Sequence, residues 1–473
     1  MDSFVFISLC LLLWLLPLPF GGNIEWAVLA LEAAVWGLLL VYLISLLKRK
    51  KAVVSEGGQG SFRAVPLLIS LFFLVSLLQL IPWPGSLVRA LSPAAWSWRQ
   101  SLVQSGLFEA VDLRNQTFSL SPWASAYELL RYLSYGVFVF LLSRVLNNRN
   151  RIKAMTLTLV SAGLFQSLYG LSEFFGGTNR IFTWVNRYYS GSAFGTFVNR
   201  DHYSAFLEML FPLSLGYFLV RSEFFSLRPG LSWRQKIVRI GQEQFQKSLL
   251  FIIPPLVIGL GLFFSRCRSG IIIFVITFFL TLILLSLTGI AGRQKTEKRL
   301  VRAVVLLVLL GVVLIGIGPV LERFAQGGFF DRNRLLFYTY TLDLISDYPL
   351  FGSGLGTYVQ AINPYLGKDF NVILTHAHND FLEMLAETGL VGGMALILAA
   401  ILAFILAFGR WLRSRDPLAK GVGLGALMGV FAVLFHSLTD FSLRMPGNAL
   451  VWLSLFVLAV KAPMISGSRE DRP

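Results

Sequence analysis

The feature that most limits the fold of this chain is the length of its apolar runs. Many approach 20 residues with few charged positions, and a helix of about 20 residues crosses a hydrocarbon core about 30 Å thick. Of the 473 residues, 55% are hydrophobic and only 14% are charged. We therefore expect an all-α integral membrane protein with about 12 transmembrane helices. The runs cover residues 4–20, 27–47, 64–82, 126–146, 154–175, 203–220, 249–265, 270–290, 303–320, 389–409, 421–439 and 448–464.

The net charge of +16 raises nucleic acid as a partner. In a membrane protein, however, Lys and Arg gather on the cytoplasmic loops. When both termini are placed in the cytoplasm, every inner loop left between the runs is rich in Lys and Arg. The pattern therefore predicts cytoplasmic termini and no nucleic-acid partner.

The cations that remain on the outer side are nearly all arginine. A guanidinium group binds phosphate or carboxylate through two parallel hydrogen bonds, which a lysine ammonium cannot do. Arginine is also the commoner cation in this chain as a whole. Even so, we expect a phosphate-type ligand on the outer side.

The runs divide the chain into four parts. These are N-terminal membrane helices over 1–150, central helices with outer arginine turns over 151–320, a large outer loop over 321–388, and C-terminal helices with a short cytoplasmic tail over 389–473. A loop of this length is often functional. Its sequence predicts a partly helical structure, with one helix that carries Arg332 and Arg334 and ends before the glycines at 352–356.

Two smaller features bear on packing. Gly421, Gly425 and Gly429 recur every four residues, a spacing typical of close helix–helix contact in membranes. Cys10 and Cys267 are too few and too far apart to predict a disulfide framework or a zinc site.

The segment HAHND, residues 376–380, contains two of the four histidines in the chain. It resembles a dinuclear zinc pattern only in part, because Phe381 stands where a further ligand is required. Zinc catalysis commonly uses three protein ligands, so we expect no metal and no cofactor. His376 and His378 remain candidates either for structural histidines or for a general base, since a neutral imidazole accepts a proton near neutral pH.

Two further segments place arginines at outer helix ends. Arg266 and Arg268 flank Cys267 in a short turn, and Arg200 stands two residues before His202. Cations at a lipid boundary act either as snorkelling anchors or as ligands of an anion. A diphosphate would offset the cost of placing these guanidinium groups there.

A base and an arginine cluster on the outer side favour one kind of chemistry. A sugar that is linked to a lipid diphosphate is already activated for transfer, because the diphosphate is its leaving group. The lipid tail of such a donor dissolves in the bilayer beside the helices. The arginines would stabilise the charge that builds on the diphosphate, and His378 would deprotonate an acceptor hydroxyl. A single displacement predicts inversion at the anomeric carbon.

The sequence resembles the O-antigen ligase/O-antigen polymerase superfamily of bacterial membrane proteins over about residues 155–460. The resemblance rests first on His378-Asn379, followed by nine residues, Gly389, two residues and Gly392. RSGIIIF, which contains Arg268, and GTFVNRDHYSAFLEM, which contains Arg200, are similar to segments with functional arginines in that family. FHSLTDFSLRMPGNA resembles the closing segment of the family, and within it we expect His436 and Asp440, four residues apart, to pack together on one helix face.

The resemblance implies a metal-independent, inverting glycosyltransferase in the bacterial inner membrane with its site facing the periplasm. The implied donor is a glycan on undecaprenyl diphosphate, and membrane lipid surrounds the reaction. His378 would be the catalytic base, and Arg268 and Arg200 would be catalytic at the diphosphate. The further substrate-binding candidates are Arg266, His376, Asn379, Arg332, Arg334 and His202.

Several alternatives stay open. A ligase transfers the glycan to a lipid A core, a polymerase extends it on another lipid-linked unit, and a protein-glycosylating relative uses Ser or Thr. In a different class, a multi-span lipid or glycan transporter also fits a chain with many membrane helices.

Overall fold

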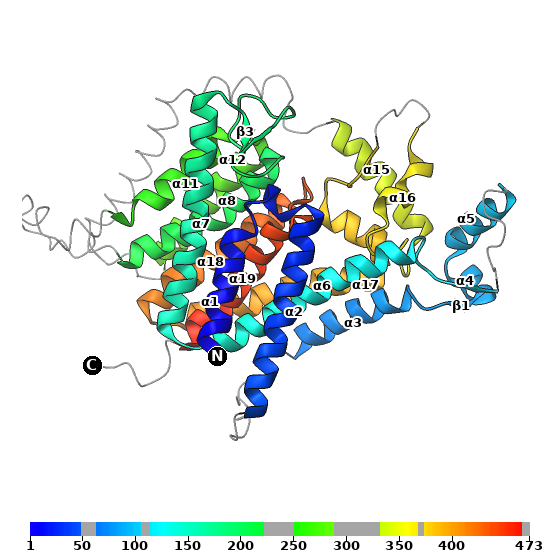
Figure 1. The fold of residues 1–473 in the computed structure, drawn as a ribbon, viewed down its shortest axis with the longest axis horizontal. Coiled ribbons are helices and arrows are strands. Elements are labelled where there is room, and N and C mark those ends of the chain that lie inside the picture. The colour runs from blue at the N-terminus through cyan, green and yellow to red at the C-terminus, as the bar shows by residue number, and fades with distance from the viewer. Residues whose placement is uncertain (49–62, 106–113, 222–249, 288–331, 368–372, 466–473) are drawn as a thin grey trace, which may run out of the picture.

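We describe a computed structural model of the protein, in which residues 1–48, 63–105, 114–221, 250–287, 332–367 and 373–465 are described. Within these residues the fold is helical, and the strands form only two short antiparallel pairs (Figure 1). The pairs are β1 (Trp83–Pro84) with β2 (Asn115–Gln116), and β3 (Arg180–Ile181) with β4 (Trp184–Val185). The predicted all-α class is therefore confirmed.

The long helices follow the apolar runs. Each predicted run except 303–320, which lies outside the described residues, overlaps a described helix. The helices are α1 (Asp2–Leu15), α2 (Glu25–Lys48), α3 (Ala64–Leu78), α6 (Pro122–Val145), α7 (Arg149–Gly176), α8 (Arg200–Arg221), α11 (Ile253–Phe264), α12 (Arg268–Leu287), α17 (Asp380–Arg413), α18 (Pro417–His436) and α19 (Pro446–Ile465).

Seven described helices are long and apolar enough to cross a membrane, namely α2, α7, α8, α12, α17, α18 and α19. Three shorter apolar helices, α1, α3 and α11, lie among them. The protein is therefore a multi-pass membrane protein, and the total of about 12 spans stays a prediction.

Helices α8 and α18 form the centre of the bundle. In their most apolar 18-residue stretches, 89% and 83% of the residues are buried. Their contact depends on glycine. A Cβ atom on Gly425 would lie 2.5 Å from the carbonyl oxygen of Pro212, and one on Gly429 would lie 2.4 Å from that of Met209. The predicted close packing at the glycine repeat is confirmed, and it joins the two helices whose ends carry the site described below.

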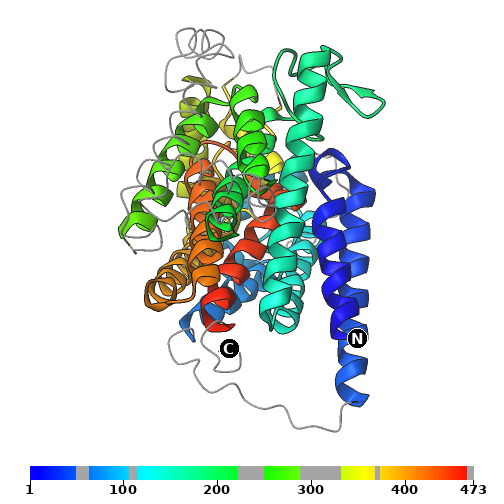
Figure 2. The same cartoon turned by 90° about the vertical axis from the view of Figure 1, so that its left-hand side faces the viewer.

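Shorter helices gather at one end of the bundle (Figure 1). Helices α15 (Arg332–Asp347) and α16 (Tyr358–Ile362) pack on each other and on the first part of α17 around a second apolar core. The helix predicted from Arg332 onward is thus present. Helices α4 (Gly85–Leu91) and α5 (Pro93–Gln104) form a small pair further out, and Figure 2 shows α1 and α2 side by side at the edge of the bundle.

Helix α17 begins at Asp380, nine residues before the predicted span. Gly389 has a left-handed backbone, with φ 67° and ψ −178°, and divides α17 into two parts. A Cβ atom there would lie 2.2 Å from the carbonyl oxygen of Leu350, so only glycine fits. Gly392 meets α3 in turn, since its Cβ atom would lie 3.1 Å from Val75. The two glycines of the sequence motif thus have a packing explanation.

Candidate functional site

The segment before α17 holds His378 in an unusual backbone conformation. Its φ is 51°, in the left-handed region that non-glycine residues rarely adopt. Asn379 follows as the N-cap of α17, where its side-chain oxygen accepts hydrogen bonds from the amides of Phe381 and Leu382, each at 3.1 Å. Tyr338 from α15 donates its hydroxyl to the carbonyl oxygen of His378 at 3.0 Å. The local sequence therefore fixes the backbone on both sides of the imidazole.

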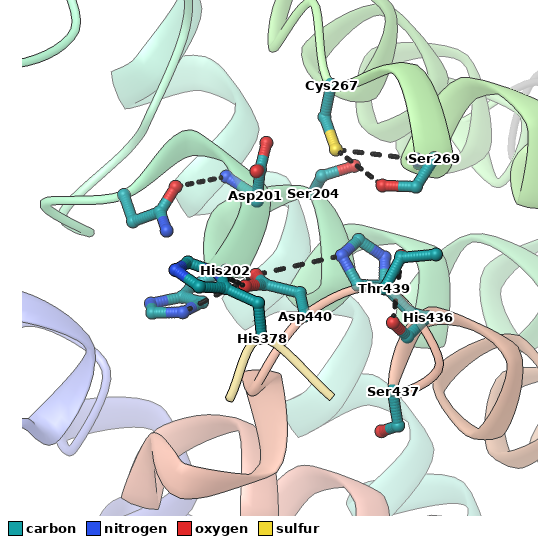
Figure 3. Close-up of polar contacts among 12 residues, drawn as sticks. Asp201, His202, Ser204, Cys267, Ser269, His378, His436, Ser437, Thr439 and Asp440 are labelled. Carbon is teal, nitrogen blue, oxygen red and sulfur yellow. Dashed lines mark hydrogen bonds and ion pairs between the residues drawn. The ribbon is translucent and has the colours of Figure 1, made fainter. Parts of the chain in front are cut away.

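Asp440 is the centre of the site (Figure 3). Its Oδ1 lies 3.1 Å from Nδ1 of His378, and its Oδ2 lies 3.5 Å from Nε2 of His202 and 3.9 Å from Nε2 of His436. The Asp440 side chain is fully buried. Burial alone would raise its pKa, but the surrounding imidazoles and Arg334 hold the pKa of Asp440 well below its ordinary value. Asp440 is therefore a carboxylate that faces three histidines.

All four histidines of the chain meet in this region. The Phe441 ring stacks on His376, with ring centroids 4.0 Å apart. It also meets His202 at 4.6 Å and His378 at 5.0 Å, both edge to face. The side chains of His376 and His378 are 28% and 27% exposed, whereas His202 and His436 are buried. Only the first two are thus open to a substrate.

His436 and Glu208 form a buried pair between α18 and α8. Nδ1 of His436 lies 3.0 Å from Oε1 of Glu208, which also accepts a hydrogen bond from the Ser204 hydroxyl at 2.9 Å. The predicted contact of His436 with Asp440 exists, but not on one helix face. Helix α18 ends at His436, and the turn that follows redirects Asp440 towards His378.

The arginines of α8 and α15 share one carboxylate. Arg334 donates from Nη2 to Oδ2 of Asp201 at 2.9 Å, and Nε of Arg200 lies 3.9 Å from Oδ1 of the same residue. Arg334 also donates to the carbonyl oxygen of Thr439, the neighbour of Asp440. The structure thus connects Arg200 and Arg334 to the histidine cluster through a chain of contacts.

Arg266 and Arg268 lie in the turn between α11 and α12. Arg266 has φ 55° and stands over the Phe174 ring at 5.4 Å, and Arg268 is the first residue of α12. Two residues on, Gly270 touches α8 so closely that a Cβ atom would lie 1.8 Å from the Ser204 hydroxyl oxygen. The turn therefore stands beside the first turns of α8, which carry Arg200 and His202. Arg332 begins α15, but its side chain lies outside the described residues.

A second buried charge cluster adjoins Phe441. Arg444 lies 2.6 Å from Oε2 of Glu387, 3.2 Å from Oε1 of Glu383 and 3.6 Å from Oε1 of Glu128. Nδ1 of His376 lies 2.8 Å from Oε1 of Glu383. Burial disfavours the charged imidazole, but the Glu383 carboxylate outweighs burial and raises the pKa of His376.

Sequence reasoning missed Asp440 and Arg444 as parts of the site. The sequence suggested that Asp380, Glu383 or Glu387 would orient the His378 ring, whereas Asp440 contacts it and Glu383 contacts His376. The one available signal was Asp-Phe at 440–441 and Arg444 inside the closing segment that resembles the family. Among the described residues, no group of three or more His, Cys, Asp or Glu side chains is arranged to hold a metal ion.

A separate cavity of about 840 Å³ lies at the other end of α7 and contains no histidine. It is lined by Ser3, Asn148, Arg149, Asn150, Arg151, Lys153 and Asp416. Because Arg149 pairs with Asp416 at 2.6 Å and Arg151 donates to the carbonyl oxygen of Val145, this corner is explained by helix-end contacts.

Apolar helices with a cluster of histidines, carboxylates and arginines at their ends define a multi-pass membrane protein with one candidate functional site among the described residues. Residues 255–397 match the family model described as O-antigen ligase. This match confirms the resemblance to the O-antigen ligase/polymerase superfamily and contains Arg266, Arg268, His376, His378 and Asn379. Arg200, His202 and Asp440 lie outside the matched segment. No curated protein matches the chain.

Proposed function

We propose that the protein transfers a glycan from an undecaprenyl-diphosphate carrier to an acceptor hydroxyl on the periplasmic side of the inner membrane. One observation carries the proposal: the partly exposed imidazole of His378 is oriented by a buried carboxylate, Asp440, next to a cluster of arginines. His378 lies within the segment that matches the O-antigen ligase family.

His378 serves as the general base. When its Nδ1–H donates to Asp440, the tautomer is fixed and Nε2 is left to accept the proton of the acceptor hydroxyl. The acceptor oxygen then attacks the anomeric carbon, and the bond from that carbon to the phosphate oxygen breaks. Its electrons remain on the departing diphosphate, so one displacement inverts the anomeric centre.

Arg268 and Arg200 bind the diphosphate and stabilise the charge that grows on it. Arg200 already shares Asp201 with Arg334, so its guanidinium is held near the site before a donor arrives. Arg266, Arg332, Arg334 and His376 are the further candidates for contact with the donor. Asn379 and His202 support the site rather than contact the donor. The Asn379 side-chain oxygen accepts the amide N–H of Leu382, and its nitrogen donates to the carbonyl oxygen of Leu438. His202 is buried beside Asp440.

A transfer assay tests the proposal. Purified protein receives a lipid-diphosphate glycan and a panel of acceptors in the presence of EDTA, and the wild type is compared with His378→Ala and Arg268→Ala. We expect each substitution to lower the rate by about 10²- to 10⁴-fold, the usual contribution of a general base or of charge stabilisation. Arg149→Ala, in the ion pair with Asp416 at the far end of α7, is the matched control and should keep its rate.

Two results would refute the proposal. Full transfer by His378→Ala would remove the base, and loss of wild-type transfer on adding EDTA alone would require a metal. The acceptor panel separates the open alternatives, since a ligase uses a lipid A core, a polymerase uses a second lipid-linked glycan, and a protein-glycosylating enzyme uses a peptide hydroxyl. Movement of the lipid-linked glycan across a vesicle membrane without transfer would indicate a transporter.

A further inference from the structure

Arg444 is surrounded by carboxylates from two helices. Its side chain is only 8% exposed, and it contacts Glu383 and Glu387 of α17 and Glu128 of α6. These contacts raise the pKa of Arg444 despite its burial. A buried charge is stable only with such compensation, so Arg444 and the glutamates depend on one another.

Glu383 holds the segment that carries the catalytic imidazole. Its Oε2 accepts the amide N–H of Ala377 at 2.8 Å, and its Oε1 lies 2.8 Å from Nδ1 of His376. One carboxylate thus contacts both residues immediately before His378. Arg444 in turn contacts the same oxygen that faces His376, with its Nε 3.2 Å from Oε1 of Glu383.

The backbone of His378 needs this support. A left-handed backbone at a non-glycine residue is strained and persists only where neighbouring contacts determine it. The contacts are the hydrogen bond from the Ala377 amide to Glu383 before His378, the Asn379 cap after it, and the Tyr338 hydroxyl on its carbonyl oxygen. Arg444 supports the first of these contacts through its ion pair with Glu383.

We propose that Glu383 and Arg444 are positioning residues for glycan transfer, which hold the His376–Ala377 backbone so that His378 reaches both Asp440 and the acceptor hydroxyl. This inference rests on the proposed function. It assigns neither residue to the donor or acceptor.

The kinetic test uses Glu383→Gln, Arg444→Gln and Arg444→Lys. A small displacement of a reacting group costs on the order of 100-fold in rate, so we expect kcat to fall about 100-fold in both Gln variants while the KM for the donor stays within about 3-fold. Lysine keeps the charge without the planar fork, so Arg444→Lys should recover part of the lost kcat. A rise in donor KM with unchanged kcat would instead make these residues part of donor binding and would overturn the proposal.

Arg99→Gln is the matched control. Arg99 is also a buried arginine, 7% exposed, but it donates to the carbonyl oxygens of Ser119 and Ala95 rather than to the histidine segment. It should lower the thermal midpoint and leave kcat per folded molecule unchanged. An equal loss of kcat in Arg99→Gln would show that the Arg444 effect is general destabilisation, and the proposal would fail.

Amide hydrogen exchange gives a readout that needs no activity. In the wild type the Ala377 amide donates a hydrogen bond to Glu383. We therefore expect the peptide spanning 373–380 to exchange faster in Glu383→Gln and Arg444→Gln, and at the wild-type rate in Arg99→Gln. If wild-type transfer is absent but this exchange pattern appears, the proposed function fails, whereas the role of Glu383 and Arg444 in holding the His376–Ala377 backbone is confirmed. Unchanged exchange in both Glu383→Gln and Arg444→Gln would show that these residues do not hold the His376–Ala377 backbone, and the proposal would fail.

Discussion

At the scale of single residues, the site depends on one carboxylate that sequence patterns do not single out. Asp440 contacts the partly exposed His378 and faces two buried histidines, His202 and His436. A base whose tautomer is fixed by a buried aspartate is the arrangement that serine hydrolases use to set the direction of proton transfer. The proposed role of His378 as a base therefore depends on Asp440 as much as on the imidazole.

Replacing Asp440 tests this dependence. Asp440→Asn keeps the shape but allows the wrong tautomer of His378, and the corresponding change in a catalytic triad costs about 10⁴-fold in rate. We expect a loss of about 10³- to 10⁴-fold in kcat with little change in acceptor KM. A variant with more than a tenth of wild-type kcat would show that Asp440 does not orient the base.

His376 predicts a pH dependence of stability. Its folded-state pKa is raised above the ordinary 6.5 through Glu383. The pair therefore contributes stability fully below the unfolded pKa and loses it as pH rises through the folded pKa. Thermal midpoints measured across neutral to alkaline pH should fall more steeply for the wild type than for His376→Gln, and parallel curves would contradict this.

At the scale of elements, the central contact of α8 with α18 brings the site together. The first turn of α8 carries Arg200 and His202, and the end of α18 leads directly into Asp440. Gly425 allows these helices to approach, because the carbonyl oxygen of Pro212 occupies the space of a side chain. This contact therefore places the start of α8 beside the end of α18, where His436 pairs with Glu208.

A pair of alanine substitutions measures the contact. Gly425→Ala places a Cβ atom 2.5 Å from a backbone oxygen, so we expect a loss of about 1–3 kcal/mol, as for other overpacked cores. Gly37→Ala in α2 meets no atom within 4 Å and should be neutral or slightly stabilising. Chemical or thermal unfolding in the same detergent makes the comparison, and equal midpoints would show that α8 and α18 do not pack this closely.

At the scale of the whole molecule, the site and the basic corner around Arg149 lie at opposite ends of long helices. Helix α7 joins them, with Arg149 at its start and Gly176 at its end. At about 1.5 Å per residue this helix exceeds the thickness of the hydrocarbon core. If the site faces the periplasm, the basic corner around Arg149 therefore faces the cytoplasm, as its Lys and Arg residues lead us to expect.

Cysteine labelling tests this orientation. In a chain with Cys10 and Cys267 replaced by alanine, Tyr188→Cys lies at the site end and Asn150→Cys at the other end, and both wild-type residues are exposed. A thiol reagent that cannot cross membranes, added to intact spheroplasts, should label only Tyr188→Cys. Labelling of Asn150→Cys alone would reverse the orientation and exclude a periplasmic reaction.

The sequence predicted the helices because apolar length is a local property, and it predicted the motif at His378 because its residues are contiguous. The same motif became interpretable in the structure, with Asn379 as a cap and Gly389 at a break in α17. Asp440 escaped recognition because the end of α18 at His436 could not be read from a continuous apolar pattern. The Arg444 cluster was equally hidden, since its partners Glu128 and Glu383 come from distant helices and meet only by packing.

The left-handed backbone of His378 also decides how a donor complex should be captured. An inactive protein for that purpose must lose the imidazole without disturbing the turn. Branched residues would be strained at φ 51°, whereas asparagine tolerates this region best among residues with a side chain. His378→Asn is thus the variant with which to trap an intact lipid-linked sugar for imaging.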